Sequence, residues 1–183
     1  MGVGLKSFIE TLETFFIGVS AAALYERQRA LARVKMLTER PGRGPGSGVR
    51  ATPESVGVLL ASLLATDNLS DVPIMTRRLL ELPIFDEPHC SLTGATTFKE
   101  ALVRILKDEK LAAKVSSVEA NRVEMDAKIT YDVVKKGSRK QGASFFRSPD
   151  HEWFDFSIQA RFAGSIILTI AAHLQIMDEE QSQ

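Results

Sequence analysis

The chain has 183 residues, 44% of them hydrophobic and 25% charged, and its 23 basic side chains balance 23 acidic ones. This composition is typical of a globular protein with one large domain or two small ones. Zero net charge argues against a uniformly basic nucleic-acid coat protein and against an acidic tail protein. The single cysteine, Cys90, excludes an intramolecular disulfide and a zinc cluster built from thiolates, which favours a cytoplasmic setting.

The charge is distributed unevenly along the chain. The segment Leu24–Arg50 holds seven Lys or Arg residues against two Glu, a local charge of +5 that the rest of the chain must offset. A local basic patch attracts phosphate groups whatever the total charge is. This segment is therefore the first candidate for contact with nucleic acid.

The first expected helix starts at Ser7–Glu10, a Ser-x-x-Glu capping box. The helix has one apolar stripe to bury, at i, i+1, i+4, i+7 and i+8: Phe8, Ile9, Leu12, Phe15 and Phe16.

The apolar run from Phe15 to Leu24, which includes three consecutive alanines, also resembles the core and cleavage site of a secretory signal. The residues before it carry Glu10 and Glu13 against Lys6 alone, which argues against one. A later apolar run, 163–177, is shorter than a bilayer requires. We therefore expect no membrane association.

Gly18-Val19-Ser20 predicts a tight turn, because glycine permits a positive φ and Ser20 can cap a following helix. The second helix is expected over Ala21–Met36. Its pattern predicts an inward face formed by Leu24, Leu31 and Val34, and an outward face formed by Tyr25, Gln28, Arg29 and Arg33.

Thr38–Ser55 contains four glycines and three prolines and cannot continue that helix. Thr52-Pro53 predicts the start of an apolar helix through Leu64, and another helix is expected over Pro73–Leu82. Pro83–Ala95 has no periodicity and is predicted to be a linker. We thus expect a helical first domain over residues 1–82.

Residues 96–177 are expected to form a small α+β domain. A second capping box, Thr97–Glu100, predicts the start of a helix. Apolar and polar residues alternate over Val123–Val133 and over Phe154–Phe162, as they do in half-buried strands, and Ala143–Arg147 suggests a third short strand. Gly164-Ser165 precedes a final helix through Ile176, and residues 178–183 are expected to be a disordered tail. A two- or three-stranded antiparallel sheet on two helices leaves open edges, so we expect a homodimer formed through this domain.

The first third of the chain, Leu5 to Leu64, resembles a winged helix-turn-helix DNA-binding domain of the kind frequent in bacterial and prophage transcriptional regulators. The first motif helix is resembled by the segment Leu12–Phe16, and the turn by Gly18-Val19-Ser20. The recognition helix is resembled by Ala21–Met36, and the wing by the stretch "GRGPGSGVR". The resemblance implies binding of double-stranded DNA through Ser20, Ala21, Tyr25, Gln28, Arg29, Arg33, Arg43 and Arg50. A small-residue helix end and a face rich in donors are what the major groove requires.

Other functions are less well supported by the sequence. A DNA-packaging subunit with an oligomerisation domain, or an adaptor whose basic helix binds an acidic protein, would show the same pattern. The glycine-rich loop lacks the spacing of nucleotide-binding loops, and neither Cys90 nor the three histidines suggest a metal or nucleophilic site. We therefore expect no enzyme, cofactor or metal, and predict a regulator that binds DNA.

Overall fold

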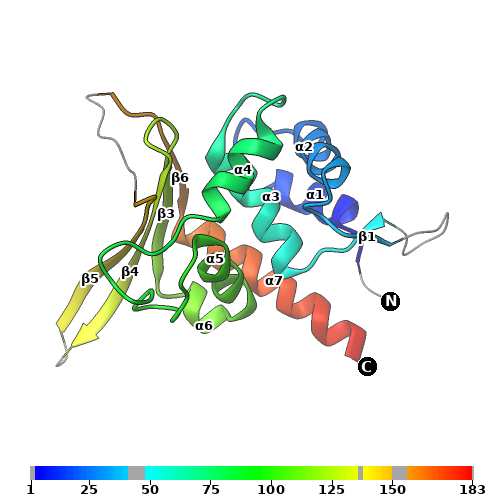
Figure 1. The fold of residues 1–183 in the computed structure, drawn as a ribbon. Helices are drawn as coiled ribbons and strands as arrows, with labels where there is room; N and C mark the ends of the chain where they lie inside the picture. The colour runs from blue at the N-terminus through cyan, green and yellow to red at the C-terminus, as the bar shows by residue number, and fades with distance from the viewer. Residues whose placement is uncertain (1–2, 41–47, 136–137, 150–155, 183) are drawn as a thin grey trace.

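A computed structural model describes residues 3–40, 48–135, 138–149 and 156–182. The fold is α+β, as predicted, with helices gathered on one face of a four-stranded sheet (Figure 1). In chain order the elements are α1 (Leu5–Glu13), α2 (Ala21–Arg33), β1 (Glu39–Arg40), β2 (Gly48–Val49), α3 (Pro53–Ala65), α4 (Val72–Leu80), α5 (Phe98–Lys107), α6 (Glu109–Ala112), β3 (Val115–Asn121), β4 (Asp126–Lys135), β5 (Ser138–Phe146), β6 (Gln159–Ala163) and α7 (Gly164–Ser182).

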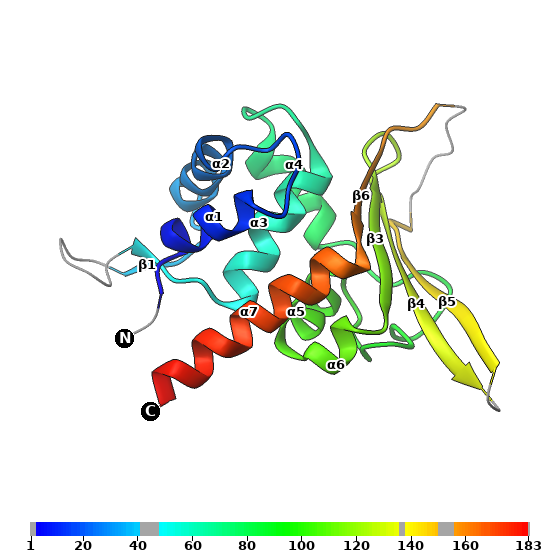
Figure 2. The ribbon, with the colours of Figure 1, turned by 180° about the vertical axis from the view of Figure 1, so that it is seen from behind.

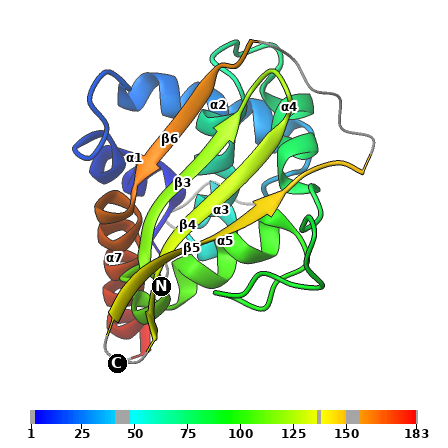
Figure 3. The ribbon, with the colours of Figure 1, turned by 90° about the vertical axis from the view of Figure 1, so that its left-hand side faces the viewer.

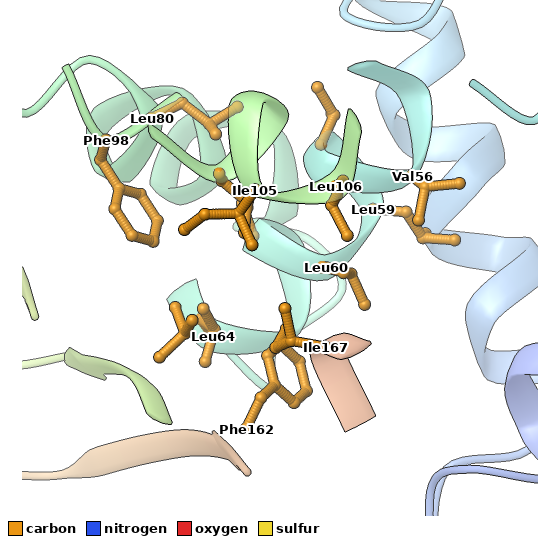
Figure 4. Packing of buried hydrophobic residues seen from close by; sticks show 14 of the residues in the cluster. Val56, Leu59, Leu60, Leu64, Leu80, Phe98, Ile105, Leu106, Phe162 and Ile167 are labelled. Atoms are coloured by element: carbon orange, nitrogen blue, oxygen red, sulfur yellow. The ribbon is translucent and has the colours of Figure 1, made fainter. Parts of the chain in front are cut away.

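Helix α3 is the centre of the hydrophobic core. Ten of its thirteen residues are buried, and α2, α4, α5, β3 and β6 all contact it. Leu60 and Leu64 of α3 converge with Phe162 of β6 and Ile167 of α7 (Figure 4). The buried residues of both chain halves form one cluster, to which Cys90 and Ala95 of the predicted linker also belong.

Several helix boundaries follow from local sequence signals. Thr52 caps α3 by accepting from the amide of Ser55, and Thr97 caps α5 by accepting from the amide of Glu100, as predicted. The capping box expected at Ser7–Glu10 is wrong: α1 begins at Leu5 after Gly4, with no side-chain cap. The apolar stripe of α1 nevertheless faces the core. The side of the helix on which these residues lie is set by their spacing in the sequence, whichever residue begins the helix.

The larger sheet has the strand order β5-β4-β3-β6, with every neighbouring pair antiparallel. The expectation of two or three strands is wrong because it missed β3, in which a bulge between Val115 and Ser117 interrupts the alternation of apolar and polar residues. The strand expected from Val123 begins at Asp126, after a turn with Met125 at φ 52°. Its alternation is correct from there on, with Ala127, Ile129 and Tyr131 buried.

Helices α5 and α7 lie on the inner face of this sheet, and no helix of the described residues covers its outer face (Figure 3). A row of charged side chains crosses that outer face: Glu119 is paired with Lys128 in register and with Arg161 by an ion pair of 3.2 Å. Figure 2 shows α7 continuing from β6 past α5. It is helical to Ser182, through most of the expected tail.

Two glycines provide a test of the packing between α7 and β3. A Cβ at Gly164 would overlap the backbone carbonyl of Val115, whereas a Cβ at Gly57 in α3 would lie 3.6 Å from the nearest side-chain atom, an ordinary contact. We expect Gly164→Ala to reduce the free energy of unfolding by about 3 kcal/mol or more. We expect Gly57→Ala to change it by less than about 1 kcal/mol, because alanine favours the helix. Urea unfolding followed by circular dichroism measures both, and equal losses would contradict the close approach at Gly164.

Candidate nucleic-acid interface

The turn between α1 and α2 has the geometry expected from its sequence. Gly18 adopts φ +85°, a conformation that favours glycine. Ser20 is the N-cap of α2, and its hydroxyl accepts from the amide of Ala23 at 3.2 Å. Leu24 is fully buried, so it anchors the start of α2 against the core. Ala21, beside the cap, is half-buried.

The outward face of α2 consists of Ala22, Glu26, Arg29 and Arg33, spaced four, three and four residues apart. Arg33 is exposed in the last turn. Arg29 donates to Glu26 at 2.9 Å, and about half of each side chain is exposed. An ion pair this exposed contributes little to stability, so Arg29 can exchange Glu26 for another anion.

Tyr25 lies at the edge of this face, half-buried. The Nζ atom of Lys6, from the first turn of α1, lies 5.4 Å from the centroid of its ring. The face therefore gains a cation from a second helix, which the sequence pattern did not indicate.

Gln28 does not belong to this face, and the prediction that it points outward is wrong. Its residue is only 7% exposed, and its buried Oε1 has no hydrogen-bond partner in the structure. Gln28 follows Leu24 by four residues and precedes Leu31 by three, so helical geometry places all three on the core side. The spacing of the two leucines was the signal that could have shown this.

Arg27 also points inward, for the same geometric reason. It is 8% exposed and donates to the backbone carbonyl of Ser62 at 2.7 Å. Burial lowers the pKa of its guanidinium, and the charge of Asp67 opposes that effect. The arginine therefore fixes α2 to the end of α3 and is not available to a ligand.

A second arginine completes the cap of α3. Arg122, in the turn between β3 and β4, donates to the carbonyls of Leu63 and Leu64 at 2.8 and 3.0 Å, and forms an ion pair with Asp67 that includes a contact of 2.9 Å. Together with Arg27 it satisfies three consecutive carbonyls at the helix end, which have no partners within the helix. No local sequence pattern indicates this arrangement, because Arg27 and Arg122 lie far apart in the chain, on either side of α3.

Strands β1 and β2 pair antiparallel after α2, with Glu39 opposite Val49 and Arg40 opposite Gly48. Arg43, predicted to contact DNA, lies outside the described residues, as does most of the expected wing. Arg50 follows β2 and is half-buried; its backbone bridges to Gly4, and its buried Nε has no hydrogen-bond partner in the structure.

Five of the predicted residues, Ser20, Ala21, Tyr25, Arg29 and Arg33, thus lie on one helix and its cap, whereas Arg50 directly follows β2. Within the described ranges, no group of three or more His, Cys, Asp or Glu side chains is placed to hold a metal, and no helix combines the length and apolarity needed to cross a bilayer.

Comparison with protein families, with curated proteins and with solved structures finds no match to this chain.

Removing the Arg122 guanidinium should destabilise the fold. We expect Arg122→Met to lower the free energy of unfolding by about 2–3 kcal/mol, because two carbonyls of α3 and Asp67 lose a charged donor. Arg161→Met is the matched control: its side chain is 63% exposed beside Glu119, so a change within about 0.5 kcal/mol is expected. Chemical denaturation compares the two variants, and an equally mild effect at Arg122 would disprove its capping role.

The same cap should give stability a pH dependence. The hydrogen bond from Arg122 holds the pKa of the Asp67 carboxyl below its usual value, so its stabilising contribution is complete above the unfolded-state pKa of about 4 and is lost as the pH falls through the folded-state value. We expect the difference in unfolding free energy between the wild type and Asp67→Asn to shrink as the pH falls below about 4. Denaturant titrations from neutral to acidic pH measure it, and a constant difference would contradict the pairing.

Proposed function

We propose that this protein is a sequence-specific DNA-binding protein of the winged helix-turn-helix type and acts as a transcriptional regulator. The observation that carries the proposal is the outward face of α2. It presents Arg29 and Arg33 to solvent behind the small Ala22, directly after a turn capped by Ser20. A helix with a small-residue start and exposed donors suits the major groove, where arginine pairs with guanine edges and with phosphates.

Two neighbouring features support the same function. Lys6 and Tyr25 extend the face toward α1, and the antiparallel pair β1–β2 follows α2 as the strands of a wing would. Wing residues contact the sugar-phosphate backbone in such domains, and that role falls to Arg50 among the described residues and to Arg43 outside them. Gln28 has no part in the proposed contacts.

The four-stranded sheet is the proposed dimerisation element. Its outer face has no helical cover among the described residues, and β5 and β6 are its edge strands. A dimer would set the spacing of two copies of α2 on a two-fold operator. Solution mass separates this arrangement from a DNA-packaging ring, which would require a larger assembly.

DNA binding can be tested with the purified chain. Selection from random duplexes should enrich one motif, and fluorescence anisotropy should show affinity that falls steeply with salt. Arg29→Ala and Arg33→Ala should each weaken binding, and loss of a phosphate contact should reduce the salt slope by about one. Lys110→Ala, a charge change on the exposed surface of α6, is the matched control and should bind as the wild type does.

Two results would contradict the proposal. Absence of binding to any duplex at low salt would exclude DNA binding and favour the adaptor function. Binding that Arg29→Ala and Arg33→Ala leave unchanged would show that α2 is not the contact surface.

A further inference from the structure

A pocket of about 370 Å³ lies where residues 36–38, which follow α2, meet the β1–β2 pair, the start of α3 and the start of α5. Its polar lining includes three cations from three separate parts of the chain: Arg40 on β1, Arg50 after β2 and Lys99 on α5. Lys99 lies beyond the predicted linker, so only the folded chain brings it to the strand pair.

The positive charge of this pocket is not neutralised by the residues that the structure describes. Within the described part of the chain, Arg40, Arg50 and Lys99 form no ion pair with any carboxylate. The one carboxylate in the lining, Glu54, is bound to Lys107 at 2.6 Å, so its charge is already compensated. Three like charges that share one pocket repel one another, and an anion would relieve that repulsion.

Arg50 is held beside the pocket with an unsatisfied donor. Its Nε is buried and has no hydrogen-bond partner in the structure, although a buried donor without an acceptor is costly. The carbonyl of Arg50 accepts from Ser55, which holds the residue against the first turn of α3. The N-terminal end of that thirteen-residue helix adds positive potential on the same side of the pocket.

We propose that this pocket binds a phosphate group. Guanidinium groups match the oxygen geometry of phosphate, and a phosphate of one to two negative charges suits three cations better than a single carboxylate does. Two sources supply this chemistry: the backbone of a DNA duplex held by α2, or a free phosphate compound. The DNA source rests on the proposed function, whereas binding of a free phosphate compound does not.

The test uses the full chain with Lys99→Gln, Arg50→Gln and the control Lys110→Gln, which removes the same charge outside the pocket. Lys99 is exposed on α5, so its substitution leaves the core intact even if Arg50→Gln perturbs folding. Thermal unfolding is measured in inorganic phosphate and in chloride at equal ionic strength, and duplex affinity is measured across a salt series.

If the source is a free phosphate compound, phosphate raises the Tm of the wild type and of Lys110→Gln by about 2–4 °C once it exceeds its Kd several-fold, and Lys99→Gln loses that rise. If the source is DNA, inorganic phosphate has little effect, but Lys99→Gln weakens duplex binding and lowers the salt slope by about one, while Lys110→Gln does not.

Phosphate stabilisation without DNA binding would support the pocket and contradict the DNA-binding function. If Lys99→Gln and Arg50→Gln match the wild type in both measurements, or if the wild type responds to neither phosphate nor duplex, the proposed site is wrong.

Discussion

The burial of α3 is the constraint on which the rest of the structure depends. Its sequence is apolar around most of its circumference, so it is stable only when other elements cover it on every side. Helices α2 and α4 pack against it together with α5 from the second half of the chain, and β3 and β6 approach it from the sheet. The two halves of the chain, on either side of the predicted linker Pro83–Ala95, therefore share one core.

Burying the end of α3 creates a second requirement, because its last carbonyls lose contact with water. Arg27 and Arg122 satisfy them, one from α2 and one from the β3–β4 turn. Asp67 balances the two guanidinium groups, which would otherwise be an uncompensated pair of like charges near the core. Through the end of α3, this cap connects α2 to the β3–β4 turn of the sheet. The position of the proposed DNA-contacting face on α2 therefore depends on contacts with both halves of the chain.

The basic segment that first suggested nucleic-acid binding thus divides into three groups with different roles. Arg27 is part of the internal cap, whereas Arg29 and Arg33 face solvent on the opposite side of the same helix. Arg40 and Arg50 turn instead toward a pocket that also receives Lys99. Counting charges along the chain could not separate these groups. Which arginines are exposed depends on the side of the helix on which each lies and on the packing of distant segments.

The sequence by itself determined the features that depend on neighbouring residues: the turn at Gly18, the caps at Ser20, Thr52 and Thr97, the apolar stripe of α1 and the alternation along β4. Backbone conformation and periodicity encode these locally. Only the tertiary structure decided the position of β3 between β4 and β6, the double cap on α3 and the meeting of Lys99 and Arg50 at one pocket. Strand β3 carries a bulge between Val115 and Ser117, which interrupts the alternation of apolar and polar residues along its seven residues, and two of its polar residues, Ser117 and Asn121, are buried. The cap and the cationic pocket join residues far apart in the chain, and their contacts exist only once α3 has gathered both halves around it.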